Sequence, residues 1–294
     1  MKKTITVFIL FILVVVSFFG CSENSKFNSL KLDFNFTIND TLKDGCGKTA
    51  KIIILAGQSN ATGVAYSEIL KEKVSQEKFK NYVSGQNNVY INYNTENGLN
   101  KSEGFVHTSV DSYYTFGPEI GLSEQLGKEQ EEYYIIKYSY GGSNLYEHWK
   151  KENECLYKGL VDYTHKSIEY LKEKNYSPQI IAMCWMQGES DAFGKTSERY
   201  YGNTKNFVNS IRKEFGNIKW IDAGISDSPY WKNYQIINEC KIRFSKLADN
   251  NYYIDTIAEG LTYNLEPKEN PDLAHYDTLS QIKLGYLFAK AVLN

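Results

Sequence analysis

The sequence IIILAGQSN at residues 52–60 joins an uninterrupted apolar run to a polar turn. A run of Ile, Leu and Ala without polar alternation is expected of a strand that is covered on both faces of a sheet. The Gly-Gln-Ser-Asn turn follows directly, so Ser59 stands at the tip of the predicted strand. This stretch therefore predicts a parallel sheet that presents a serine at its edge.

Apolar runs and amphipathic stretches alternate along the rest of the chain. The sequence predicts strands at residues 51–56, 89–93, 133–138, 179–186 and 219–226. It predicts helices at residues 118–130, 156–174, 197–215, 235–249 and 279–293, and a long loop at residues 96–115. Alternating strands and helices of this size build a parallel sheet with helices on each side. Because no internal repeat and no dividing linker follow residue 50, we expect a single α/β domain over residues 50–294.

Short polar motifs fall at the ends of the predicted strands. Ser59 follows the first strand, Gly141-Gly142-Ser143 follows the third, and residues 187–191 follow the fourth. Asp272-Leu273-Ala274-His275 precedes the last helix. In open α/β sheets, ligands bind outside the carboxyl ends of the strands. The motifs are therefore expected to meet in one cleft.

Ser59, Asp272 and His275 supply the parts of a nucleophilic site. A serine hydroxyl is a weak nucleophile at neutral pH and needs a base within hydrogen-bond reach, and that base needs an orienting carboxylate. The Asp-x-x-His spacing can place both side chains on one turn, facing the same point. These residues predict a hydrolase. His107, His148 and His165 are the competing histidines, and His165, inside an amphipathic helix, is expected to be a surface or packing residue.

The charge balance gives no sign of a polyanionic partner. The formal net charge is −2 and the sequence pI is about 6.2. Since there is no basic stripe, we expect no nucleic acid partner. The chain holds 24 Tyr, whose rings and hydroxyls suit sugar surfaces, although abundant Tyr is also explained by genome composition.

The N-terminus resembles an export signal. Lys2-Lys3 precedes an apolar run at residues 7–16, which is too short to span a membrane and right for a signal peptide at residues 1–20. Cys21 follows directly, so we expect a lipoprotein whose lipidated Cys21 anchors an envelope protein to the membrane. An ordinary secreted protein with an incidental cysteine is the alternative. Residues 21–49 are expected to form a tether, with a strand at residues 30–36.

Export permits disulfides, but the remaining cysteines are widely spaced. They form no zinc pattern, and their pairing cannot be deduced from the sequence. Cys184 lies in a buried-strand pattern and is expected to be a free core thiol. These cysteines are Cys46, Cys155, Cys184 and Cys240.

Five blocks occur in order along residues 50–294 and together resemble those of a known family. The blocks are Gly57-Gln58-Ser59-Asn60, Phe116-Gly117-Pro118-Glu119, Gly141-Gly142-Ser143 followed by Trp149, residues 185–191 and residues 272–276. They resemble the sialate O-acetylesterase and acetylxylan esterase family of the SGNH hydrolase superfamily. The resemblance implies a flavodoxin-like three-layer α/β/α sandwich with a sheet order near 2-1-3-4-5. It also implies a serine esterase that removes acetyl groups from sugars without a metal or cofactor.

The resemblance assigns roles to individual residues. Ser59 matches the nucleophile, His275 the general base and Asp272 the carboxylate that orients the imidazole. The backbone N–H groups of Ser59 and Gly142 match two oxyanion donors, and the side chain of Gln187 is the candidate for a third.

Four further residues are candidates for substrate binding. Glu189 and Asp191 either contact substrate or hold loops together. His148 is a candidate to line the cleft, and Trp149 either stacks on a sugar or packs as a lid. Trp185, in an apolar strand, is expected in the core.

Two other functions remain open from the sequence. A non-catalytic glycan-binding protein of the same fold would keep the cleft without turnover, and a short-chain or lipid esterase would keep the chemistry with another substrate. The sequence does not identify the acetylated sugar.

Overall fold

A computed structural model describes residues 42–102, 104–110, 115–153, 155–263 and 265–294. The predicted signal peptide, Cys21 and the strand predicted at residues 30–36 lie outside the described residues. The main sheet is built from β1 (Thr49–Gly57), β3 (Val89–Thr95), β7 (Tyr133–Ser139), β8 (Ser177–Met186), β9 (Lys219–Ala223) and β10 (Asn251–Ile254). The larger helices are α5 (Glu119–Leu126), α6 (Leu156–Glu173), α7 (Gly194–Phe215), α8 (Tyr234–Ser245) and α9 (Thr278–Leu293).

Shorter elements complete this part of the chain. Helices α2 (Ser59–Thr62), α3 (Ser67–Lys73) and α4 (Gln76–Ser84) lie between β1 and β3. The 3-10 turns are η1 (Glu96–Gly98), η2 (Lys151–Asn153) and η3 (Glu189–Asp191). The short strands are β2 (Ala65–Tyr66), β4 (Asn100–Lys101), β5 (Val106–His107) and β6 (Thr115–Phe116).

The strands run in the order β10-β9-β8-β1-β7-β3-β4, and all neighbours from β10 to β3 are parallel. The expected order near 2-1-3-4-5 is wrong, because β7 lies between β1 and β3 and the predicted strands run 2-3-1-4-5. The connection from β1 to β3 contains three helices and is long enough for β3 to lie two strand positions away from β1. Strand β7 then occupies the position between them.

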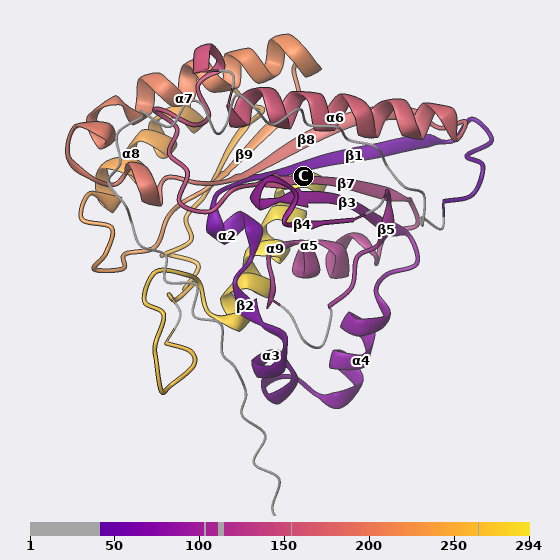
Figure 1. Cartoon of the computed structure of the whole chain (residues 1–294), viewed down its shortest axis with the longest axis horizontal. Coiled ribbons are helices and arrows are strands. Elements are labelled where there is room, and N and C mark those ends of the chain that lie inside the picture. The colour runs from indigo at the N-terminus through magenta and orange to yellow at the C-terminus, as the bar shows by residue number, and fades with distance from the viewer. Residues whose placement is uncertain (1–41, 103, 111–114, 154, 264) are drawn as a thin grey trace, which may run out of the picture. The chain divides into compact units, whose positions relative to one another are not determined.

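The predicted layers are confirmed: α6, α7 and α8 cover one face of the sheet, and α5 and α9 cover the other (Figure 1). Helices α5 and α9 approach closely because both carry a glycine at the contact. A Cβ atom on Gly121 would lie 1.9 Å from the carbonyl oxygen of Ile282, and one on Gly285 would lie 2.1 Å from that of Pro118. This contact fixes α9, which begins just after the predicted Asp-x-x-His motif.

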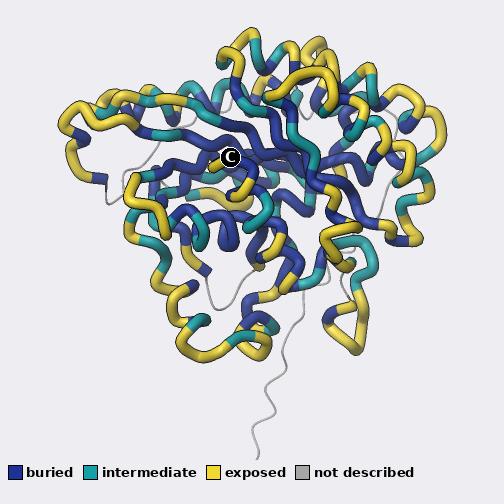
Figure 2. The backbone as a smooth tube through the Cα atoms, turned by 180° about the vertical axis from the view of Figure 1, so that it is seen from behind, coloured by how far each residue is buried: buried dark blue, intermediate teal, exposed yellow. Residues whose placement is uncertain are grey.

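The centre of the sheet is the core of the described residues, as the dark strands of Figure 2 show. Every residue of β7 is buried, and Ile52 to Ala56 of β1 have no exposed surface. Trp185 and Cys184 are fully buried, and Cys184 is a free thiol, as the sequence predicted. Alternation is absent from these strands because both faces meet helices.

The prediction of a long loop at residues 96–115 is wrong. This segment contains η1 and the short strands β4 and β5, both of which pair antiparallel with β3 and make the sheet mixed. Two-residue strands carry no periodicity that a sequence pattern can reveal. Strand β10 was also not predicted. Helix α7 begins earlier than expected, at Gly194, and α5 ends earlier, at Leu126.

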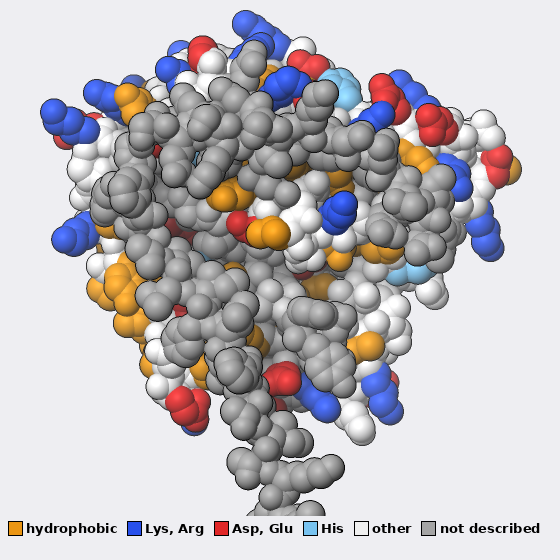
Figure 3. All heavy atoms as spheres, viewed as in Figure 1, with side chains coloured by type: hydrophobic (Ala, Val, Ile, Leu, Met, Phe, Trp, Pro, Cys, Tyr) orange, Lys and Arg blue, Asp and Glu red, His pale blue; other side chains and the backbone are white. Residues whose placement is uncertain are grey.

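Acidic and basic side chains are mixed on the surface. Lys and Arg side chains lie beside Asp and Glu around the visible face rather than in one stripe (Figure 3). Surface ion pairs such as Lys48–Glu132 and Lys158–Asp162 follow the same mixture. None of the helices in the described part of the chain is long and apolar enough to cross a membrane.

Candidate active site

Ser59 is presented where β1 ends and α2 begins. Gly57 has a φ of +143°, and a Cβ atom there would lie 1.9 Å from the carbonyl oxygen of Met186 on β8. Only glycine permits this close approach. The next residue, Gln58, donates its N–H to the same Met186 oxygen at 2.9 Å. The tip of β1 is therefore fixed against β8, and Ser59 follows at the start of a short helix.

The structure brings Ser59, His275 and Asp272 together in a line. His275 Nε2 lies 2.8 Å from Ser59 Oγ, and His275 Nδ1 lies 2.6 Å from Asp272 Oδ2. Ser59 and His275 are separated by 216 positions along the chain and are joined only by the fold. With its Nδ1–H donated to Asp272, the imidazole presents Nε2 to Ser59 as a proton acceptor.

Asp272 is held as a carboxylate. Burial alone would raise its pKa, but the hydrogen bond with His275 and the His275 charge outweigh burial and hold the pKa below its ordinary value. The backbone N–H groups of Ala274 and His275 also lower the Asp272 pKa, and the Ala274 N–H lies 2.8 Å from Oδ1. An ionised Asp272 can therefore orient the imidazole and stabilise its protonated form.

Two backbone N–H groups near Ser59 are available to an oxyanion. Gly142 is exposed and has a φ of +67°, and neither its N–H nor that of Ser59 has a partner among the described residues. The preceding Gly141 lies beside the nucleophile, since a Cβ atom built on it would lie 3.7 Å from Ser59 Cβ. This arrangement is compatible with the predicted donors, whose role stays a prediction.

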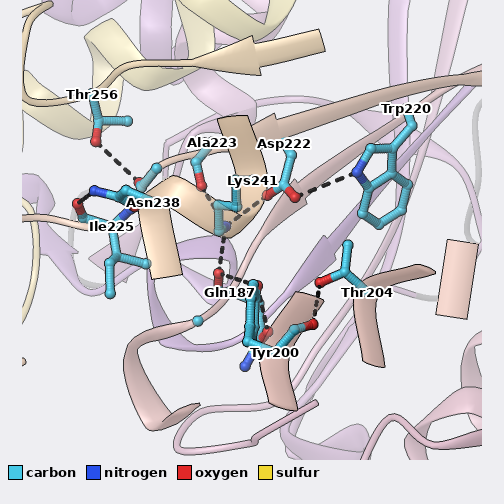
Figure 4. A network of polar contacts seen from close by, with 12 residues as sticks. Gln187, Tyr200, Thr204, Trp220, Asp222, Ala223, Ile225, Asn238, Lys241 and Thr256 are labelled. Carbon is cyan, nitrogen blue, oxygen red and sulfur yellow. Dashed lines mark hydrogen bonds and ion pairs between the residues drawn. The ribbon is translucent and has the colours of Figure 1, made fainter. Parts of the chain in front are cut away.

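Gln187 is fully buried in a polar network beneath the site. Its Nε2 donates to Asp191 Oδ2 at 2.6 Å and to the Ser143 carbonyl at 3.1 Å. Tyr200 donates its hydroxyl to Gln187 Oε1 at 3.2 Å, and Lys241 Nζ donates to the Gln187 carbonyl at 2.6 Å (Figure 4). Both hydrogens of the Gln187 amide have buried acceptors. Gln187 could donate to an oxyanion only if one of these hydrogen bonds breaks, so its role as a third donor stays a prediction.

The surroundings of Glu189 and Asp191 fit the structural alternative rather than contact with substrate. Both residues have no exposed surface. Glu189 Oε1 accepts from Asn60 Nδ2 at 2.7 Å, and Asp191 Oδ2 accepts the Leu145 N–H at 2.7 Å. Burial raises the pKa of Glu189, and it raises that of Asp191 to about 7. The two acids hold loops together, which is the structural alternative that the sequence left open.

Trp149 is likewise not a sugar platform, because it is fully buried. Its Nε1–H donates to Ser143 Oγ at 2.9 Å, and its ring meets Trp185 edge-on at a centroid distance of 5.0 Å. The neighbouring His148 is half-buried, its Nδ1 accepts the Asn144 N–H at 3.1 Å, and burial lowers its pKa. Contact of His148 with a sugar stays a prediction.

The other histidines have partners elsewhere. His165 Nε2 lies 2.6 Å from Glu214 Oε1 at the surface of α6, as expected. His107 Nδ1 lies 3.0 Å from the Gln86 carbonyl at the sheet edge. In the part of the chain that the structure describes, no cluster of three or more His, Cys, Asp or Glu could hold a metal ion.

Three residues of the site had no role assigned from the sequence. Asn60 accepts the Tyr276 N–H, Gln58 Oε1 accepts the N–H groups of Gly188 and Ser190, and Glu96 accepts the Gly141 N–H. Gln58 and Asn60 flank Ser59 in the same motif, so their position beside the nucleophile was the available signal. Glu96 carried no signal, because it lies in a segment without periodicity.

The mostly parallel sheet with helices on both faces, and the grouped serine, histidine and aspartate at its carboxyl edge, are typical of a serine hydrolase. A sequence profile of the family described as "Carbohydrate esterase, sialic acid-specific acetylesterase" matches residues 49–294. The chain belongs to this family, so it is a carboxylic ester hydrolase with carbohydrate O-acetylesterase function. No curated protein matches the sequence.

Solved structures share the fold at low sequence identity. A protein from Arabidopsis thaliana has a TM-score of 0.60 and 20% identity over 83% of this chain and 97% of its own. NanS has a TM-score of 0.60 and 14% identity over 84% of this chain and 97% of its own. A carbohydrate acetylesterase from Xanthomonas citri has a TM-score of 0.56 and 12% identity over 82% of this chain and 55% of its own.

Proposed function

We propose that the chain releases acetate from acetylated sugars through an acetyl-enzyme intermediate on Ser59. The observation that carries this proposal is the continuous line from Ser59 Oγ through His275 to Asp272, with contacts of 2.8 and 2.6 Å. Both distances lie within the hydrogen-bond range that nucleophile activation requires.

In the first half of the reaction, Ser59 Oγ attacks the acetyl carbonyl carbon while His275 Nε2 takes the hydroxyl proton. The carbonyl oxygen becomes an oxyanion, toward which the Ser59 and Gly142 N–H groups are free to donate. Collapse of the tetrahedral intermediate breaks the bond to the sugar oxygen. That oxygen takes the proton from His275 and leaves as a hydroxyl group.

In the second half, His275 takes a proton from water, and the resulting hydroxide attacks the acetyl carbon bound to Ser59 Oγ. The same donors hold the second oxyanion. Collapse breaks the bond to Ser59 Oγ, which takes the proton back from His275, and releases acetic acid, which loses its proton to solvent to give acetate. Asp272 stabilises the imidazolium in both halves without taking its proton.

Ser59→Ala tests the nucleophile. The substitution removes one half-buried hydroxyl, so the fold should persist while turnover on an acetyl ester falls by about 10⁴-fold or more. The control is the thermal unfolding midpoint of the variant. Retention of more than about a tenth of wild-type turnover would overturn the assignment of Ser59.

Acetate release across a panel of acetylated glycans tests the substrate. The family description and the Xanthomonas citri carbohydrate acetylesterase support a sugar ester, and the panel should include acetylated sialic acid and acetylated xylan. A simple nitrophenyl acetate and a lipid ester complete the set. A preference for the lipid ester would favour the lipid-esterase alternative. Binding of a glycan without acetate release would favour a non-catalytic binding protein.

We also propose that Cys21 carries a lipid and anchors the enzyme in the cell envelope. The support is the Lys2-Lys3 pair, the apolar run at residues 7–16, and Cys21, which lies five positions after this run and directly follows Gly20. Cys21→Ser should release or mislocalise the protein in the native host. Mass spectrometry that finds a mature N-terminus beyond Cys21 would contradict the anchor and favour an ordinary secreted enzyme.

A further inference from the structure

Glu96 connects the helix that carries the nucleophile with the loop that carries the candidate oxyanion donor. It is the first residue of η1, directly after β3. Glu96 Oε1 accepts the Gly141 N–H at 2.7 Å and lies 3.1 Å from Thr62 Oγ1, at the end of α2. Thr62 Oγ1 also lies 2.9 Å from Ser139 Oγ at the end of β7. One carboxylate oxygen therefore joins two segments of the site.

The carboxylate lies next to the reacting residue. A Cβ atom built on Gly141 would lie 3.2 Å from Glu96 Oε1 and 3.7 Å from Ser59 Cβ. Gly141 thus fills the narrow space between the carboxylate and the nucleophile. The Gly141 peptide immediately precedes the peptide whose N–H, on Gly142, points to no partner among the described residues.

The backbone of Glu96 is held in a conformation that its side chain disfavours. Its φ is +53°, in the left-handed region, where a non-glycine residue typically costs about 1–2 kcal/mol. Such residues persist when surrounding contacts over-determine them, and they concentrate at functional sites. A glycine would adopt this turn without strain. The carboxylate contact with Gly141 is the feature that glycine could not supply.

The hydrogen bonds, rather than an ion pair, account for the placement of this carboxylate. Among the described residues, no Lys, Arg or His forms an ion pair with Glu96. Burial raises the pKa of Glu96 above its ordinary value, although the Gly141 N–H and the Thr62 hydroxyl act in the opposite direction. Its second oxygen accepts no hydrogen bond from the described residues. Of its two hydrogen bonds with described residues, the one from the Gly141 N–H is the shorter, at 2.7 Å.

We propose that Glu96 is a positioning residue that aims the Gly142 N–H at the oxyanion by fixing the Gly141 peptide. This inference rests on the proposed function, since it concerns the oxyanion of that reaction. A backbone donor stabilises the transition state only if it is already aimed at the developing charge. Displacement of such a group by about 1 Å can cost about 100-fold in rate. The effect belongs to kcat, because the oxyanion exists only in the transition state and intermediates.

Three substitutions separate the reach of the side chain from its charge. Glu96→Gln keeps an acceptor oxygen at the same distance and removes the charge. Glu96→Asp keeps the charge and shortens the side chain by one methylene, so it can no longer reach Gly141. Glu96→Ala removes both. Glu68→Ala, on the exposed face of α3, is the matched control and should behave like the wild type.

We expect Glu96→Asp and Glu96→Ala to lower kcat on an acetyl ester by about 10- to 100-fold with KM within about twofold of wild type. Glu96→Gln should recover most of the turnover. A boronic acid that forms a tetrahedral adduct with Ser59 should lose affinity in Glu96→Asp by the same factor as kcat/KM. The loss of boronic acid affinity should exceed any change in KM. A merely structural defect would not produce this difference.

Two results would overturn the proposal. The first is a Glu96→Asp variant that keeps the kcat of an active wild-type enzyme. The second is a Glu96→Gln variant as impaired as Glu96→Asp, which would show that the charge matters rather than the hydrogen bond. If Glu96→Ala fails to fold, the Asp and Gln variants still decide the question. A wild-type protein that releases no acetate would contradict the proposed function itself, and this inference with it.

Discussion

Asn60 Oδ1 accepts the backbone N–H of Tyr276 at 3.0 Å, so the residue after the nucleophile holds the residue after the base. The Asn60 side chain is buried and also donates Nδ2 to Glu189 Oε1 at 2.7 Å. Gln281 Nε2, on α9, donates to Asn60 Oδ1 at 3.1 Å. One amide therefore joins the tips of β1 and β8, the histidine loop and α9.

Asn60→Ala should lower kcat on an acetyl ester by about 10-fold or more, because His275 loses its fixed position relative to Ser59. It should also lower the free energy of unfolding by about 1–3 kcal/mol, since the buried Glu189 carboxylate loses its donor. Kinetics and urea unfolding measure the two effects. Gln281→Met removes a donor to the same amide and leaves the Tyr276 contact, so it should keep its kcat. Equal kcat losses in both variants would contradict a positioning role for Asn60.

Much of the site could be predicted because its residues are fixed by local sequence. The apolar run of β1 and Gly57 place Ser59 at a strand tip, and Asp272 and His275 lie on one turn by their spacing alone. The strand order could not be predicted in the same way. The strand order depends on how many strand positions each connection spans, and no local sequence pattern encodes that number.

The ambiguities among the site residues have a different origin. Glu189 and Asp191 lie in a motif at a strand end, and their charge suggested contact with substrate. The motif does not show that Asn60 and Leu145 supply buried donors to them. Trp149 was ambiguous for the same reason, because its burial depends on Trp185 of β8 and Phe207 of α7, which are distant in the sequence. Glu96 could not be found at all, since it reaches Gly141 from a left-handed backbone conformation that no local pattern predicts.

The orienting carboxylate can be identified by comparing Asp272→Asn with Glu189→Gln. Asp272 lies 2.6 Å from the His275 ring, whereas Glu189 is bonded to Asn60. Asp272→Asn should lower kcat by about 10²–10⁴-fold, and His275→Ala should lose more, because it removes the base. KM should barely change in either variant. If Glu189→Gln loses most of its kcat while Asp272→Asn stays near wild type, the orienting carboxylate comes from the loop after β8.

Lys241 and Asp222 form a buried ion pair below the site (Figure 4). Lys241 Nζ donates to Asp222 Oδ1 and to the carbonyl oxygens of Gln187 and Ala223, each at 2.6 Å. Lys241→Met leaves a buried carboxylate without its cation, so it should lower the free energy of unfolding by about 3–5 kcal/mol. The double variant Lys241→Met with Asp222→Asn should recover part of that loss, as measured by urea unfolding. A double variant less stable than Lys241→Met would contradict this account.

Asp191 should make the free energy of unfolding fall as the pH rises from about 4 to neutrality. Burial raises its pKa from 3.8 to about 7, although the Leu145 N–H, the Gln187 amide and the Tyr146 N–H lower it. Between these two values the folded chain holds a proton that the unfolded chain has released. The contribution of this group is therefore fully present below pH 3.8 and is lost as the pH rises through about 7.

Asp191→Asn is the matched test, because an amide has the shape of the acid and cannot ionise. Its oxygen can accept from Leu145 and Gln187, both of which donate to the same oxygen, Oδ2, in the wild type. The wild type should lose stability relative to Asp191→Asn as the pH rises from about 4 to about 8, as measured by urea unfolding at each pH. If the wild type instead gains stability relative to the variant as the pH rises, the three donors outweigh burial and Asp191 is ionised in the folded protein at neutral pH.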